Sequence, residues 1–260
     1  MDNNAKPDSW FGRSQKKLIK IGIPALLILA ATGSLYAMGY RVTRHLSFGK
    51  IGTVQVEIPL AGTAVFADAS KKVVTAEDGE IVSFAFSPTV HTVLIARDGY
   101  FPWKKDVDVP KGGLVVLHPF FVTKNATGEI ITTIDPEYFS IKSKVEKHPF
   151  PTKEKPFISE DGTASLWIED NAILVEKTAE ADSARIVIQP DTIIKNAEFY
   201  KDRSDVILFS SSAAVYAIEA DKAGGQNFMP VYSGENPDFT HGGAGFIYVL
   251  DGSNLMQVVI

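Results

Sequence analysis

A single uncharged apolar run, Ile21 to Tyr40, stands apart from the rest of the sequence. As a helix rising about 1.5 Å per residue, this run would extend roughly 30 Å, the thickness of the hydrocarbon core of a bilayer. Pro24 lies in the first turn of the run, where a missing backbone N–H costs least. Trp10 before the run and Tyr36 near its end suit the two membrane interfaces. We therefore predict a transmembrane helix over residues 21–40.

The charges that flank this run predict its orientation. Five basic residues precede the run and three follow it, namely Lys6, Arg13, Lys16, Lys17, Lys20 and then Arg41, Arg44, Lys50. This bias predicts a cytoplasmic tail over 1–20, a juxtamembrane link over 41–51 and an extracytoplasmic remainder. A cleavable signal peptide is the alternative, but its nearest cleavage site, Leu35-Tyr36-Ala37, is poor. An uncleaved signal anchor at the cell membrane is favoured.

After the link, apolar and polar residues alternate with a period of two. In GTVQVEIP, residues 52–59, Val54, Val56 and Ile58 share one face, and the same alternation recurs up to residue 123. Short alternating segments separated by Pro, Gly and Asp-Gly predict a small antiparallel β-sandwich over 52–123. Within it, Asp98-Gly99 predicts a turn with positive φ.

The same segment resembles the PEGA domain, a compact β-sandwich of bacterial and archaeal surface proteins. The resemblance rests on GTVQV at residues 52–56, on PLAGTAVF at residues 59–66, and on the Gly99-Tyr100 pair that ends a strand. The sequence departs from the family where Pro-Glu-Gly-Ala becomes Pro-Leu-Ala-Gly-Thr-Ala and where two Pro-containing turns differ. The resemblance implies a surface-exposed binding module and names no ligand.

An aromatic cluster follows the Asp-Gly turn. It contains Tyr100, Phe101 and Trp103, with Lys104 and Lys105 beside it. In the PEGA family the Gly-Tyr pair stands at a structural corner, so we expect these side chains to pack mainly at the edge of the sandwich. The alternative is a partner-contact patch with the two lysines as its rim.

Residues 124–156 are predicted to connect the sandwich to the rest of the chain. Their second half, 141–156, is rich in lysine and proline and shows little periodicity, which predicts an extended, semi-rigid linker. Its lysines could also attract an anionic envelope polymer, although a solvated linker is the expected role.

The remainder, 157–260, repeats with a step of about forty residues, which is the period of a four-stranded propeller blade. Phe157, Phe199 and Phe239 begin the three units, and each precedes a polar turn and an apolar strand. The pattern resembles the blades of TolB-like bacterial propellers. Closed propellers have about four or more blades, so we expect an incomplete, propeller-like β lobe. It could be an open lobe packed on the first domain, which we favour, or be completed by a second chain or by a partner. The apolar C-terminal segment LMQVVI is expected to be paired.

The chemistry-bearing residues show no catalytic or metal-binding pattern. The five histidines, His45, His91, His118, His148 and His241, are far apart in the sequence and are expected at the surface or in turns. Acidic neighbours such as Glu160-Asp161, Glu169-Asp170, Asp135 with Glu137 and Asp202 with Asp205 flank turn signals. The chain has no cysteine and a net charge of −5, which disfavours thiol chemistry and nucleic-acid binding. We predict no catalytic residue, cofactor or metal.

Three functions remain as hypotheses. The leading one is a non-catalytic, single-pass membrane protein that presents β domains to envelope polymer or to surface proteins. The second is a scaffold subunit that forms homo-oligomers through its open repeat edge. The third and least favoured is an envelope glycan hydrolase, in which Glu169 or Asp202 would be required for activity.

Overall fold

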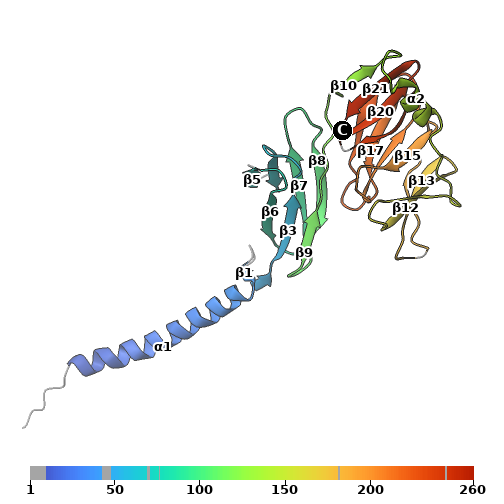
Figure 1. The fold of residues 1–260 in the computed structure, drawn as a ribbon. Coiled ribbons are helices and arrows are strands. Elements are labelled where there is room, and N and C mark those ends of the chain that lie inside the picture. The colour runs from blue at the N-terminus through green and yellow to red at the C-terminus, as the bar shows by residue number, and fades with distance from the viewer. Residues whose placement is uncertain (1–9, 43–47, 69–70, 76, 181, 244) are drawn as a thin grey trace, which may run out of the picture. The chain divides into compact units, whose positions relative to one another are not determined.

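The computed structural model describes residues 10–42, 48–68, 71–75, 77–180, 182–243 and 245–260 (Figure 1). His45, most of the predicted cytoplasmic tail and part of the juxtamembrane link lie outside these residues. The chain forms two compact units, which we describe separately. The first comprises the described parts of 1–55, 83–89 and 108–116, and the second those of 56–82, 90–107 and 117–260.

The first element is the helix α1, Trp10–Ala37, whose side chains are described from Gly22 onward. We predicted Pro24 in the first turn of the helix. Because the helix begins at Trp10, Pro24 lies in its interior instead. The helix ends where Gly39 adopts a φ of 84°, a conformation that suits glycine. Leu26, Leu27, Ile28 and Leu29 are all highly exposed, between 64% and 72%.

Among the residues with described side chains, no helix combines the length and the apolar character needed to cross a membrane. The predicted span begins at Ile21, outside those described side chains, and it stays a prediction. Two short strands, β1 (Tyr40–Val42) and β2 (Phe48–Lys50), form an antiparallel pair after the helix.

Two sheets follow. One is three-stranded, in the order β6-β3-β9, and the other is four-stranded, in the order β5-β4-β7-β8. Their strands are β3 (Gly52–Glu57), β4 (Ala64–Ala67), β5 (Lys71–Val74), β6 (Ile81–Phe86), β7 (Val90–Ala96), β8 (Trp103–Asp108) and β9 (Leu114–Leu117). The predicted alternation is confirmed, since Val54, Val56 and Ile58 are fully buried. The predicted turn is confirmed as well, with a φ of 83° at Gly99.

The connecting segment 124–156 is more ordered than we predicted. It contains the strand β10 (Gly128–Ile131) and the helix α2 (Tyr138–Glu146). The extended conformation expected from residue 141 onward is therefore wrong for the first part of that stretch. Tyr138, Ile141 and Val145 have helical spacing and are buried, and α2 packs on two strands of the third repeat described below.

Three four-stranded sheets make up the repeat region (Figure 1). Their orders are β11-β12-β13-β14, β15-β16-β17-β18 and β10-β21-β20-β19, and neighbouring strands within them are antiparallel. The strands are β11 (Phe157–Ile158), β12 (Ala164–Glu169), β13 (Ala172–Lys177), β14 (Arg185–Ile188), β15 (Asn196–Phe199), β16 (Val206–Ser210), β17 (Ala214–Glu219), β18 (Phe228–Ser233), β19 (Pro237–Gly243), β20 (Phe246–Asp251) and β21 (Asn254–Val259). The repeat aromatics Phe157, Phe199 and Phe239 lie on β11, β15 and β19, the first strands of the three repeat units.

The third sheet takes its fourth strand from upstream in the same chain. β10 pairs with β21, so the C-terminal segment has a partner on both sides, as expected. Gly128 allows this pairing, because a Cβ at this position would lie only 2.0 Å from the carbonyl oxygen of Gln257. Each repeat sheet is thus completed to four strands within one chain.

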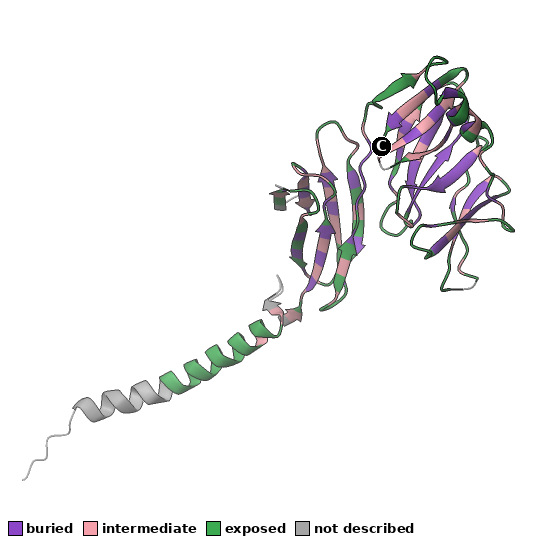
Figure 2. Ribbon diagram, in the orientation of Figure 1, coloured by how far each residue is buried: buried purple, intermediate pink, exposed green. Residues whose placement is uncertain are grey.

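The buried residues of the repeat region lie mainly on the strands of its sheets (Figure 2). One apolar cluster joins the first two sheets and includes Leu166, Ile173, Ile207 and Phe209, each at most 1% exposed. A smaller cluster places Ile141 and Val145 of α2 against Leu255 of the third sheet. Consecutive sheets also contact each other through β12 and β15 and through β17 and β19.

Candidate functional site

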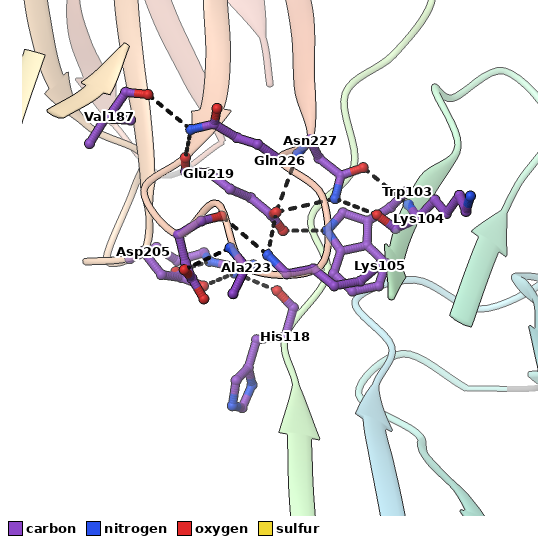
Figure 3. A network of polar contacts seen from close by, with 12 residues as sticks. Trp103, Lys104, Lys105, His118, Val187, Asp205, Glu219, Ala223, Gln226 and Asn227 are labelled. Atoms are coloured by element: carbon purple, nitrogen blue, oxygen red, sulfur yellow. Dashed lines mark hydrogen bonds and ion pairs between the residues drawn. The ribbon is translucent and has the colours of Figure 1, made fainter. Parts of the chain in front are cut away.

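The predicted aromatic patch is partly an internal contact of the second unit (Figure 3). Trp103 is 2% exposed, and its Nε1–H donates to Oε1 of Glu219 at 2.6 Å. The ammonium of Lys105 lies 2.8 Å from Oε2 of the same carboxylate. Two residues of the patch therefore bind the end of β17, 114 to 116 positions further along the chain.

A side-chain amide covers the backbone of β8 at the same place (Figure 3). The N–H of Lys104 donates to Oδ1 of Asn227 at 3.0 Å, and Nδ2 of Asn227 donates to the Lys104 carbonyl at 3.0 Å. Beside it, the N–H of Asp106 donates to the carbonyl of Gly224 at 2.6 Å. These bonds occupy the free edge of a sheet, which otherwise favours association with other strands.

The carboxylate of Glu219 is the centre of this network. It also accepts hydrogen bonds from the backbone N–H and the Nδ2 of Asn227, at 3.3 and 3.2 Å. The side chains of Lys105 and Glu219 are only 12% and 7% exposed. A buried ion pair tolerates desolvation only when its remaining hydrogen-bonding positions are filled, as they are here. The network therefore joins β8 to the second repeat sheet.

The other residues of the patch differ from these two. Tyr100 is half-buried, with its ring 5.3 Å from that of Phe121 and the guanidinium of Arg97 5.2 Å from its centroid. Phe101 is also half-buried, whereas the side chain of Lys104 is exposed. A partner-contact role for Tyr100, Phe101 and Lys104 stays a prediction.

A second cluster brings together two histidines and a glutamate that the sequence analysis did not connect. Glu198 lies on β15 and is 8% exposed. Its carboxylate contacts Nε2 of His148, and its Oε2 lies 2.9 Å from Nε2 of His241 on β19. That nitrogen is also 2.8 Å from the carbonyl oxygen of Phe199. The expectation of a surface position is wrong for the side chain of His148, which is 11% exposed, whereas the side chain of His241 is 35% exposed.

The repeat aromatics were the signal that could have found this cluster. Glu198 precedes Phe199, and His241 follows Phe239 by two positions, on the equivalent first strands of neighbouring sheets. Because these strands lie side by side, residues adjacent to the repeat aromatics approach one another. His148 comes from the segment after α2, and no sequence pattern connects it to the other two.

The cluster shifts the titration of two of its members. Burial by itself would raise the pKa of Glu198, but hydrogen bonds and charge interactions with the two imidazoles outweigh it and lower this pKa. Burial would likewise lower the pKa of His241, but the Glu198 carboxylate and the Phe199 carbonyl raise it. Each shift favours the charged form of its own group, the carboxylate of Glu198 and the imidazolium of His241.

Two adjoining cavities surround His148. One, of about 360 Å³, is lined by the three members of the cluster together with apolar side chains such as Phe157, Ile158 and Phe199. The other, of about 650 Å³, is lined by polar residues of α2 and by Thr240. His148 and Pro149 line both cavities. Nδ1 of His148 is buried with no hydrogen-bond partner among the described atoms.

A further cavity, of about 710 Å³, is lined by some of the predicted acidic residues. Asp161, Asp202 and Asp205 line it, whereas Glu169, Asp170, Asp135 and Glu137 do not. Asp161 accepts hydrogen bonds from Ser159, Thr163 and Ser204, and the first two in particular hold its pKa well below the usual range. A general acid needs a raised pKa, so the direction of this shift makes Asp161 unsuited to that role.

Asp135 stabilises a turn, because its carboxylate accepts hydrogen bonds from the backbone N–H and the hydroxyl of Thr132.

Among the described residues, no three His, Asp or Glu side chains are grouped so that they could hold a metal ion. We found no protein-family model that matches this chain, and no curated protein matches it.

Proposed function

We propose that this protein is a non-catalytic, single-pass membrane protein that presents its β domains outside the cytoplasm for binding. The observation that carries the proposal is the exposure of α1. Leu26, Leu27, Ile28 and Leu29 cover all sides of one helical turn, and each is at least 64% exposed. Exposed apolar surface costs about 25 cal/mol per Å² in water, and this cost disappears in lipid. No cofactor is part of the proposal.

The rest of the chain supports a binding role in three ways. The PEGA-like alternation and the three four-stranded sheets at a step of about forty residues are consistent with a sandwich followed by a propeller-like lobe. β10 completes the third sheet within the chain, which favours the open lobe over a ring shared between two copies. The cavities around His148 offer concave surface in that lobe.

Single cysteines test the topology, because the natural chain has none. Asp2→Cys and Lys222→Cys each place one thiol in the full-length protein, at the N-terminus and at an exposed position of the repeat region. In intact cells, a membrane-impermeant maleimide should label Lys222→Cys, and it should label Asp2→Cys only after permeabilisation. The unmodified protein is the control for labelling of other groups. Equal labelling of both variants in intact cells, or the reverse order, would contradict the proposal.

A further inference from the structure

The helix α2 presents a polar face of unusual composition. Ser140, Ser143 and Lys144 on α2, and Lys147 directly after its end, follow one another at intervals of three, one and three residues, so their side chains lie on one side. Tyr138, Ile141 and Val145 of α2 face the third repeat sheet instead. Two hydroxyls and two ammonium groups therefore project together from one side of the helix.

This face lies in a hollow, which distinguishes it from an ordinary solvated helix surface. The cavity of about 650 Å³ is lined by these four residues together with His148, Pro149 and Thr240. All of its polar lining groups can donate a hydrogen bond, and none of these residues is acidic. A concave surface with converging donors is suited to several oxygen atoms of one ligand.

The charge of the hollow is not neutralised by the described part of the chain. Lys142, on another side of α2, pairs with Glu146 at 3.8 Å. Among the described residues, Lys144 and Lys147 have no acidic side chain within ion-pair distance. Lysines in the last turn of a helix also stabilise its C-terminus, which accounts for part of their presence. It does not account for the hydroxyls beside them, or for a local positive surface on a chain of net charge −5.

The second cavity extends the hollow towards the repeat sheets. It shares His148 and Pro149 with the first. Its other lining residues include the aromatic Phe157 and Phe199 and one residue of each charge, Glu160 and Lys201. Glu198 within it is already engaged by the two imidazoles. An anion-binding half thus adjoins a half with aromatic side chains, and such side chains pack well against sugar rings.

We propose that these adjoining cavities bind an acidic glycan polymer, with Lys144 and Lys147 contacting its anionic groups and the aromatic half contacting a sugar ring. The inference rests on the proposed function, because it names the ligand class of the presented lobe. The shared chemistry is a repeated phosphate or carboxylate group on a polyhydroxylated chain.

Binding by the full-length protein in a non-ionic detergent tests the inference. The probes are sodium polyphosphate, polygalacturonate and neutral dextran, with the dissociation constant measured by calorimetry at low ionic strength. The variant is Lys144→Glu with Lys147→Glu. Its matched control is Lys111→Glu with Lys222→Glu, which changes the net charge equally at two exposed positions elsewhere. Lys144→Ala with Lys147→Ala serves as a second variant if the charge reversals unfold α2, as judged by circular dichroism.

We expect a polyanion to bind, and the reversal at α2 to weaken it about tenfold or more, with a clearly smaller effect of the control pair. Binding should also be lost near 1 M salt, where the Debye length is about 3 Å. Preference for polyphosphate or for polygalacturonate would identify the anionic group as phosphate or carboxylate. Equal weakening by the control pair, equal binding of dextran, or no binding of either polyanion would overturn the inference. Because the topology is measured separately by cysteine labelling, failure of this assay leaves the membrane-anchor proposal intact.

Discussion

The buried ion pair between Lys105 and Glu219 makes a quantitative prediction about stability. The variant Glu219→Gln keeps the size of the side chain and a carbonyl oxygen that can accept from Trp103, but it removes the charge that pairs with Lys105. The side chain of Lys105 is 12% exposed, so its ammonium loses its partner in a mostly buried position. Removing one partner of such a pair typically costs about 3–5 kcal/mol.

The lower end of this range applies here. The Lys105 ammonium keeps its hydrogen bond to the carbonyl oxygen of Asp221 at 3.3 Å. This hydrogen bond lies at an exposed position. We therefore expect Glu219→Gln to lower the free energy of unfolding by about 3 kcal/mol. The double variant Lys105→Met with Glu219→Gln removes both charges, and it should recover on the order of 2 kcal/mol of that loss.

Urea unfolding of the full-length protein in non-ionic detergent measures both effects. Tryptophan fluorescence follows the transition, with Trp103 reporting on the network and Trp167 on the first repeat sheet. The control is Lys142→Met, which removes one partner of an ion pair on the surface of α2 and should cost less than about 1 kcal/mol. A double-mutant cycle also needs the single variant Lys105→Met. A loss below about 1 kcal/mol for Glu219→Gln, or a loss in the double variant equal to the sum of the losses in Glu219→Gln and Lys105→Met, would refute the assignment of this pair as a coupled buried contact.

Two further predictions concern a glycine and a pH dependence. Gly224→Ala should destabilise the protein by more than about 2 kcal/mol, because φ is 69° and the new Cβ would lie 1.7 Å from the Asp106 carbonyl oxygen. Gly99→Ala, also at positive φ but with open space around it, should cost only about 1 kcal/mol, and equal urea midpoints would contradict this reasoning. The raised pKa of His241 contributes stability that is present below its ordinary value of 6.5 and is lost as the pH rises through the folded-state value. The lowered pKa of Glu198 contributes stability that is present above its ordinary value of 4.5 and is lost as the pH falls through the folded-state value. The cluster should therefore stabilise the protein most between pH 4.5 and pH 6.5, the ordinary pKa values of the two groups. Glu198→Gln should reduce the difference between the urea midpoints measured at pH 5.5 and pH 8.5. An unchanged pH dependence in that variant would count against the cluster.

The sites were less predictable than the strands. Trp103 was expected to pack at a corner and is buried, whereas Lys105 was expected only as the rim of a partner patch. No local pattern indicates that Glu219 and Asn227 complete the contact. The cluster at Glu198 was missed, because its two histidines are 93 positions apart and are separated by two complete repeat sheets. Local patterns describe neighbours within a strand or helix, whereas these contacts depend on how whole sheets pack.

The alternation of apolar residues by itself determined the strands around Val54, Val56 and Ile58, since a period of two leaves one face to be buried. The spacing of Phe157, Phe199 and Phe239 likewise determined three equivalent units, because each unit begins with the same aromatic position. Only the tertiary structure decided that β10 completes the third sheet, that α2 replaces an extended linker, and that His148 and His241 meet at Glu198. These features depend on pairings between distant segments, whose free energy comes from surfaces that exist only once the separate sheets have formed.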